Sequence, residues 1–252
     1  MNDLLQVLRR IFSLHADAAT HEEIKERIIS GGQVTGTNMC VLICAILIAS
    51  VGLNTGSTAV IIGAMLISPL MGSLLAMAYN TVAIHRHHLR RHAYGFAFQI
   101  LISLLVSTLY FLISPVNAPT SELLARTQPT FFDVIVAVAG GFAGIIGNTR
   151  KDKANNVVPG VAIATALMPP LCTCGYSIAH GQWRMLLGAA YLFLVNCYFI
   201  YMSAAVILSI LSIPRETALT EKEWNRLRRK MVRNTIIVVL PSIVLTFLMT
   251  HD

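Results

Sequence analysis

The residues of this chain that are best suited to bind a solute or an ion lie in two apolar stretches, each interrupted by proline. Residues 63–72 read GAMLISPLMG, and residues 164–175 read ATALMPPLCTCG. Proline removes one backbone hydrogen bond from a helix and frees a carbonyl oxygen. In a membrane, such a break is tolerated only where protein covers it or where it lines a wet cavity. Paired interruptions in the two halves of a membrane protein therefore point to a solute-binding site.

The residues around these prolines supply hydroxyl and amide groups without charge. Helix N-termini exposed at such breaks attract anions, whereas freed carbonyl groups attract cations. The alternative interpretation is that the prolines kink helices packed in a bundle, while serine and threonine bond to their own backbone. The candidate solute- or ion-binding residues are Ser68, Pro69, Thr165, Pro169 and Pro170, with Asn54, Asn148 and Asn196 as lesser candidates.

The composition places these stretches in a membrane. Of the 252 residues, 55% are hydrophobic and 12% are charged, whereas soluble domains carry about 25% charged residues. The net charge of +7 lies in segments between apolar runs, without interleaved aromatic residues. This arrangement fits membrane topology and disfavours nucleic-acid binding. No Asp, Glu, Lys or Arg lies deep within an apolar run of the sequence, which disfavours a proton relay or a voltage sensor.

The apolar runs predict about seven transmembrane helices. With the N-terminus inside, all but two of the 19 lysine and arginine residues fall in cytoplasmic segments; the exceptions are Arg126 and Arg184. This bias predicts a cytoplasmic N-terminus and an external C-terminus. In the fourth run, Gly140 and Gly144 form a GxxxG pattern that permits close helix packing. The runs cover about 38–53, 57–79, 94–113, 132–146, 157–178, 184–211 and 231–249.

The two proline motifs also suggest an internal repeat. Aligning Pro69 with Pro170 places the sequence LISPL on LMPPL. Each half would contain three spans, and an odd number makes the second half enter the membrane from the opposite side. We therefore predict an all-α, polytopic protein with a 3+3 inverted repeat, two proline-broken helices that meet near the membrane centre, and a C-terminal helix. The predicted parts are a cytosolic helical lead at 1–37, repeats at about 38–114 and 132–211 within a core at 38–211, and a basic helix running into the last span at 212–252.

The remaining candidates favour packing or lipid contact over chemistry. Residues 85–92 read HRHHLRRH, which could bind a transition metal but better fits a basic segment that contacts anionic lipid headgroups. Cys172 and Cys174 fit small packing residues better than soft-metal ligands. The sequence contains no recognisable nucleophile motif, phosphate loop or paired catalytic carboxylates. We therefore expect no enzyme activity, no cofactor and no metal site.

Three segments resemble a prokaryotic family known as the "uncharacterised hydrophobic domain" proteins. They are residues 52–72, GLNTGSTAVIIGAMLISPLMG; residues 160–171, GVAIATALMPPL; and residues 193–196, FLVN. The resemblance covers about 40–211 and implies a bacterial or archaeal multi-pass protein of the plasma membrane. It supplies neither an established activity nor site residues.

These patterns together predict a transporter or channel for a small solute, with anions among the candidates. The alternative is a non-transporting scaffold, lipid-binding or sensor protein of the membrane. A chain of 27.5 kDa is small for a transporter, so we also expect a homo-oligomer.

Overall fold

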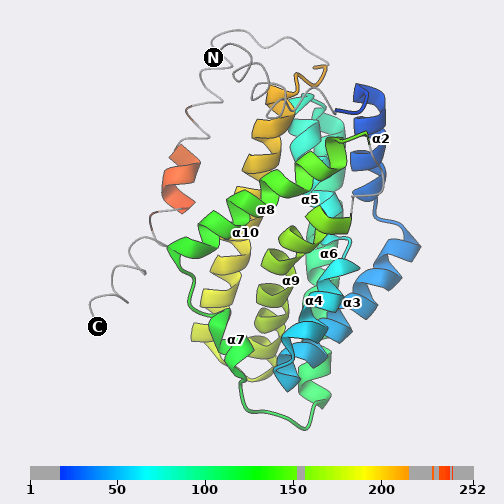
Figure 1. The fold of residues 1–252 in the computed structure, drawn as a ribbon. Helices are drawn as coiled ribbons and strands as arrows, with labels where there is room; N and C mark the ends of the chain where they lie inside the picture. The colour runs from blue at the N-terminus through cyan, green and yellow to red at the C-terminus, as the bar shows by residue number, and fades with distance from the viewer. Residues whose placement is uncertain (1–17, 152–156, 216–228, 230–232, 239, 241–252) are drawn as a thin grey trace, which may run out of the picture.

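The computed structural model describes residues 18–151 and 157–215, with 229, 233–238 and 240; for residues 157–166 it describes the backbone alone. Within these residues every named element is an α-helix (Figure 1), which confirms the predicted all-α class. Residues 1–17 of the predicted helical lead and most of the predicted seventh span lie outside the described residues. The helices are α2 His21–Gly31, α3 Gly36–Thr55, α4 Thr58–Leu66, α5 Leu70–Val82, α6 Arg86–Ile113, α7 Ser121–Ala125, α8 Phe131–Thr149, α9 Val157–Ala179 and α10 Trp183–Ile210.

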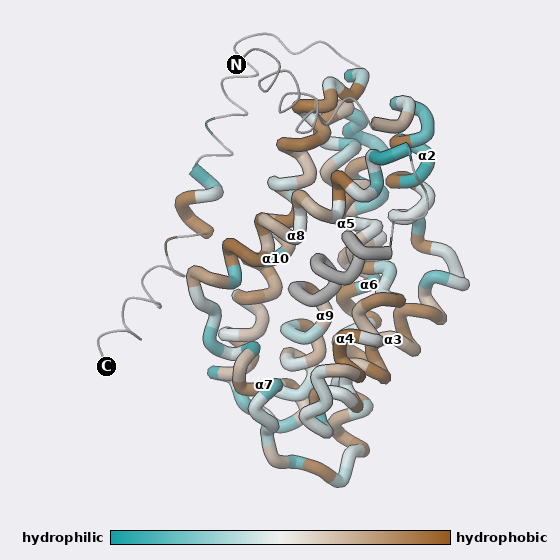
Figure 2. Tube along the Cα trace, in the orientation of Figure 1, coloured by the Kyte–Doolittle hydropathy of each residue, from teal (hydrophilic) through white to brown (hydrophobic). Residues whose placement is uncertain are grey.

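Four helices of the described chain, α3, α6, α8 and α10, are long and apolar enough to cross a membrane, and the bent pair α4–α5 would make a fifth. Only 28% of the apolar window of α6 is buried in the protein, and 56% of that of α10. The other apolar side chains face outward, as expected where lipid is the solvent. Figure 2 shows hydrophobic segments along α3, α4 and α8 and a largely hydrophilic α2. The protein is therefore a multi-pass membrane protein, while the count of seven spans stays a prediction.

The helices α8 and α10 pack closely because α8 is rich in glycine. Gly140, Gly141 and Gly144 are all buried. A methyl group on Gly141 would lie 2.9 Å from the Cα atom of Ile200 and 3.0 Å from its carbonyl oxygen. Gly140 and Gly144 of the GxxxG pattern are buried, while the close contact with α10 is made at Gly141, between them. This contact sets the spacing of two helices that line the candidate site.

The short helix α2 docks on the beginning of α5. Thr20 and Glu23 form the capping box that starts α2, and Ile24 and Ile28 are buried in a cluster with side chains of α5. At the other end, the Gly32 carbonyl oxygen accepts a hydrogen bond from Ser73 Oγ at 3.4 Å. The charged face of α2 stays exposed. The contact fixes α5 immediately after Pro69.

The two proline motifs differ in backbone structure. The helix that begins at Thr58 stops at Leu66 and resumes at Leu70, with a bend of 47°. Pro69 has no backbone N–H to donate, and the following N–H, that of Leu70, donates to the Ser68 hydroxyl at 3.4 Å.

The second expected break, at Pro169–Pro170, is absent, because α9 continues through both prolines. Proline inside a helix costs about 3 kcal/mol, and burial of the neighbouring side chains opposes that cost. Met168 and Leu171 lie in the main buried core. The prediction of two broken helices was therefore wrong for α9, and the inverted repeat stays a prediction.

Candidate functional site

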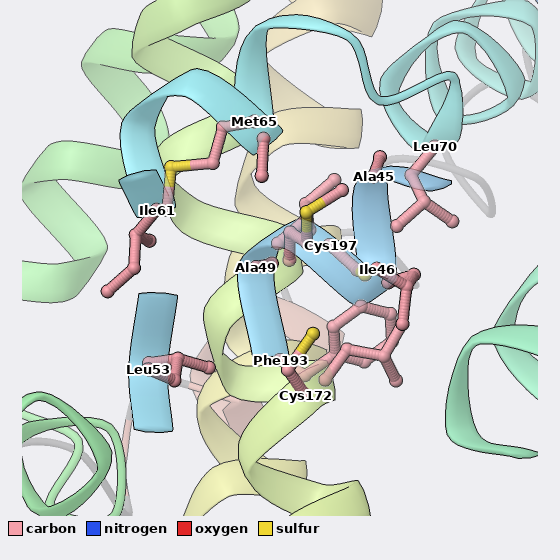
Figure 3. Packing of buried hydrophobic residues seen from close by; sticks show 14 of the residues in the cluster. Ala45, Ile46, Ala49, Leu53, Ile61, Met65, Leu70, Cys172, Phe193 and Cys197 are labelled. Atoms are coloured by element: carbon pink, nitrogen blue, oxygen red, sulfur yellow. The ribbon is translucent and has the colours of Figure 1, made fainter. Parts of the chain in front are cut away.

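A cavity of about 250 Å³ lies where α4 meets α8, α9 and α10. It joins the two proline motifs, since Met65 comes from the helix that ends before Pro69 and Pro170 comes from the second motif. Leu70 and Leu167, from the same two motifs, lie in one buried core. Figure 3 shows Met65, Ile61 and Leu70 with other side chains of this core. The cavity is lined by Thr58, Ile61, Ile62, Met65, Glu122, Arg126, Asp133, Val136, Pro170, Leu192 and Asn196.

The lining is charged at one end and uncharged elsewhere. Thr58 begins α4, Asp133 lies in the first turn of α8, and Arg126 follows α7 directly. These charged and hydroxyl groups lie near the N-termini of α4 and α8 and at the end of α7. Met65 and Pro170 lie further along α4 and α9. We call the polar residues Thr58, Glu122, Arg126 and Asp133 the cavity mouth.

A network of hydrogen bonds and one ion pair positions the mouth. The Thr58 hydroxyl donates to Glu122 Oε1 at 2.7 Å, and Arg126 Nη2 lies 3.6 Å from Glu122 Oε2. The backbone N–H and the hydroxyl of Thr130 donate to Asp133 Oδ2 at 2.7 and 2.9 Å. The Asp133 carboxylate thereby caps the N-terminus of α8, where the helix dipole stabilises a negative charge.

The loop that carries Glu122 and Arg126 is tied to the bundle at several points. Thr120 Oγ1 donates to the Leu53 carbonyl oxygen at 2.6 Å, and Tyr176 Oη donates to the Asn117 carbonyl oxygen at 2.7 Å. Leu123 is fully buried. A methyl group on Gly188 would collide with the Thr127 backbone, so α10 also approaches this loop closely.

The structure brings together only part of the predicted site. Pro170 and Asn196 line the cavity. Pro69 and Ser68 lie at the bend after α4, outside the lining, while Pro169 is buried next to Pro170 within α9. The side chain of Thr165 lies outside the described residues.

The other two asparagines lie elsewhere. Asn54 Nδ2 donates to Tyr110 Oη at 3.3 Å and to Ser114 Oγ at 2.6 Å, both on the side of α6. Asn148 Nδ2 donates to the Gly144 carbonyl oxygen of its own helix. It lies 15 residues from Asp133 along α8, or about 22 Å at the rise of an α-helix. Asn148 therefore does not contribute to this cavity.

The sequence patterns missed the charged residues of the mouth. Glu122, Arg126 and Asp133 come from segments that hydropathy treats as a loop and the edge of a span. One signal was present: Arg126 is one of the two basic residues that the topology predicts outside. An isolated arginine that is predicted outside and follows a short helix capped by Thr120 could have indicated this loop as part of a site.

A second polar region joins α3, α6 and α9. Ser50 Oγ donates to Ser107 Oγ at 3.3 Å, and Ser107 Oγ donates to the Cys172 carbonyl oxygen at 3.0 Å. Hydrogen bonds of this kind hold membrane helices together. This region explains how α9 is held next to the cavity, and it does not itself line the cavity.

The histidine segment at the start of α6 is not arranged as a metal centre. The ring centroid of His88 lies 5.9 Å from that of His85 and 5.8 Å from that of His87. Across the part of the chain that the structure describes, no three His, Cys, Asp or Glu side chains are grouped so as to hold a metal ion. His92 is buried instead, with Nδ1 3.1 Å from the Gly32 carbonyl oxygen.

Helical architecture and apolar surfaces define a multi-pass membrane protein, and comparison with known proteins then specifies its family. Residues 65–202 match the family described as "Domain of unknown function (DUF389)". This match covers more than half of the chain, so the protein belongs to that family, as the resemblance of the proline motifs predicted. The matched region includes the second motif, all of the first except Gly63 and Ala64, and most of the cavity lining.

A curated relative is an uncharacterized protein of the archaeon Methanocaldococcus jannaschii, 29% identical over 177 residues. The aligned region is 70% of this chain and 54% of the relative, so the chain spans about half the length of the curated relative that it matches. No solved structure matches the chain significantly.

Proposed function

We propose that this protein moves a small solute across a membrane, as a transporter or a channel, along a path that includes the cavity. The observation that carries the proposal is that Met65 and Pro170 line the same cavity together with Asn196. These residues come from two proline-containing segments about a hundred residues apart. Transporter binding sites typically lie beside a broken membrane helix, and here the broken helix is α4–α5, while α9 is continuous. The proposal requires neither a cofactor nor a catalytic residue.

The volume and polarity of the cavity support a small solute. Drug-sized ligands occupy pockets of about 300–1,000 Å³, and this cavity is smaller, at about 250 Å³. The N-terminus of α4 lies at the mouth, since its first residue, Thr58, is part of the lining. The positive end of this half-helix favours negatively charged groups on the solute, in agreement with the anions that the sequence leaves among the candidates.

The proposal includes a membrane orientation, with the N-terminus cytoplasmic and the cavity mouth outside. It can be tested in a variant whose five native cysteines are replaced by serine or alanine. We expect Ser121→Cys to react with a membrane-impermeant maleimide in intact cells, because Ser121 is exposed beside the mouth. Arg90→Cys, exposed near the start of α6, should react only after permeabilisation. The reverse pattern would place the mouth in the cytoplasm and contradict the orientation.

The transport proposal predicts that filling the cavity blocks solute flux. Val136 lines the cavity, whereas its neighbour Ile135 does not, and both side chains are 52% exposed. In vesicles containing purified protein, Val136→Trp should reduce flux by about tenfold or more, which corresponds to about 1.4 kcal/mol on the transport barrier. Ile135→Trp should retain wild-type flux, because its side chain points elsewhere on α8.

The flux assay uses a panel of radiolabelled small anions, amino acids and neutral solutes. Equal flux through both tryptophan variants would contradict a path through this cavity. Failure of correctly inserted wild-type protein to move any solute would favour the alternative, a scaffold, lipid-binding or sensor protein.

Whether or not the protein transports a solute, we propose that the exposed basic residues near the start of α6 contact anionic lipid headgroups. We also propose that the protein forms a homo-oligomer.

A further inference from the structure

The cavity mouth contains charges of both signs within one small site. Arg126 supplies a positive charge, and Glu122 and Asp133 supply negative charges. We propose that the solute of this cavity is a zwitterion that carries a carboxylate and an ammonium group, such as a small α-amino acid. This inference rests on the transport function proposed above and specifies its substrate class.

Arg126 and the beginning of α4 form the pole that would bind the carboxylate. Arg126 Nε is buried and has no hydrogen-bond partner among the described residues, although Nη2 faces Glu122. The Ser57 carbonyl oxygen accepts a hydrogen bond from Ile61 N at 3.1 Å. The Ser57 side chain makes no capping bond to α4, so the first N–H groups of this helix have no side-chain acceptor from their own N-cap. Guanidinium groups and helix N-termini are both strong carboxylate binders.

Asp133 and Glu122 form the pole that would bind the ammonium group. Both hydrogen bonds from Thr130 end on Asp133 Oδ2, and a carboxylate has acceptor sites on two oxygens. Glu122 is held by Thr58 and Arg126, so its carboxylate is fixed beside the same space. An ammonium group, with three donors, can bond to oxygens of this pair while the solute carboxylate faces Arg126.

The balance of charge favours a zwitterion over a simple ion. The mouth has one more acidic than basic side chain, which opposes a simple anion, while Arg126 opposes a simple cation. The deeper lining, including Met65, Pro170 and Leu192, carries no charge. A solute with a net charge would lose its hydration there without a counter-charge. A zwitterion carries its own counter-charge through this region.

The apolar walls indicate the rest of the solute. Ile61, Ile62 and Val136 lie beside the charged mouth and offer a surface for a small apolar side chain. The volume of about 250 Å³ equals that of about eight water molecules in the liquid. This space suits an amino acid of the size of alanine to leucine.

Equilibrium binding to purified protein in lipid nanodiscs tests the substrate class. The probes are radiolabelled alanine and leucine, together with propionate and 4-methylpentanoate, which lack the amino group, and ethylamine and 3-methylbutylamine, which lack the carboxylate. We expect at least one amino acid to bind about tenfold or more tightly than both of its singly charged counterparts, a difference of about 1.4 kcal/mol. Equal binding of the three probes in each set, or no binding of either amino acid, would overturn the inference.

Variants of the two poles test the assignment of residues. Arg126→Gln and Asp133→Asn should each weaken binding of the amino acid by about tenfold or more. The matched control is Arg184→Gln, which removes the other arginine predicted outside, an exposed residue of α10 that does not line the cavity. Unchanged binding in both pole variants would overturn the assignment. Thermal unfolding identifies any variant that fails to fold. If a variant fails, the comparison of amino acids with singly charged probes on wild-type protein tests the substrate class by itself.

Flux of the same probes separates this inference from the general transport function. Arg126-dependent amino acid binding without flux would support the site and contradict transport. Flux of singly charged solutes that is unaffected by Arg126→Gln would support transport and contradict a zwitterionic substrate.

Discussion

Gly141→Val is expected to destabilise the protein by about 3 kcal/mol or more, the upper end of the range for overpacked cores. A side chain at Gly141 meets Ser203 Cβ at 2.7 Å, Ile200 Cα at 2.9 Å and the Ile200 carbonyl oxygen at 3.0 Å. Two of these atoms are backbone atoms, which cannot move aside by a rotamer change. Since α8 and α10 would have to separate, the cavity that they line would also be distorted.

Unfolding in a denaturing detergent, monitored by circular dichroism, measures this effect, and gel filtration measures the yield of folded protein. The control is Gly63→Ala on α4, because a methyl group there meets no atom within 4 Å. This control should be neutral, or more stable by about 0.5–1 kcal/mol because alanine favours the helix. A wild-type unfolding midpoint for Gly141→Val would show that α8 and α10 do not approach as closely as described.

Gly72→Val is expected to release α2 from the bundle. A methyl group at Gly72 would collide with the Gly31 carbonyl oxygen and lie 2.6 Å from the Gly31 carbonyl carbon. Undocking exposes Ile24 and Ile28, each of which contributes about 1.5–3 kcal/mol when buried. Since α2 has 11 residues and isolated helices shorter than about 12–15 residues are marginal in water, the released helix should unfold.

Amide hydrogen exchange across residues 21–31 measures the release. We expect protection to fall by about a hundredfold or more, the equivalent of about 2.8 kcal/mol of local stability. Gly31→Ala is the matched control, since a methyl group at Gly31 meets nothing within 4 Å and should leave protection within a few-fold of wild type. Unchanged protection in Gly72→Val would contradict the docking of α2 on α5.

Hydropathy predicted where the helices lie more reliably than where they end. The apolar runs at 38–53 and 132–146 are shorter than the about 20 residues that a transmembrane helix needs, and the helices extend beyond them to Gly36–Thr55 and Phe131–Thr149. Similarly, α6 begins at Arg86, eight residues before the predicted start at Tyr94. Hydropathy reports which residues can face lipid, whereas a helix continues as long as its backbone bonds and side-chain contacts allow.

Local capping chemistry was also predictable, because it depends on residues three positions apart. The spacing Thr-x-x-Glu at Thr20 and Glu23 predicts a capping box, and the capping box is present. The same chemistry at Thr130 and Asp133 is visible in the sequence as Thr-x-x-Asp. It was missed because aspartate takes the place of the more familiar glutamate or glutamine.

The course of α9 through its prolines could not be predicted from local preferences. Local propensity favours a break at Pro169–Pro170, and only buried contacts with other helices outweigh it. The cavity mouth has the same origin, because Glu122 and Thr58 are 64 residues apart in the chain. Such pairings follow from how the helices pack against one another. The periodicity of hydrophobic residues in a single sequence does not predict them.

The anchored loop between α6 and α8 has a consequence for affinity. Its helix α7, with five residues, is too short to persist alone, yet Thr120 and Asn117 tie it to α3 and α9. The conformational entropy of arranging Glu122 and Arg126 is therefore lost during folding, before any solute arrives. The mouth is preorganised, so solute binding avoids that ordering cost. Changes at the distant anchors could consequently weaken affinity while every residue that lines the cavity stays the same.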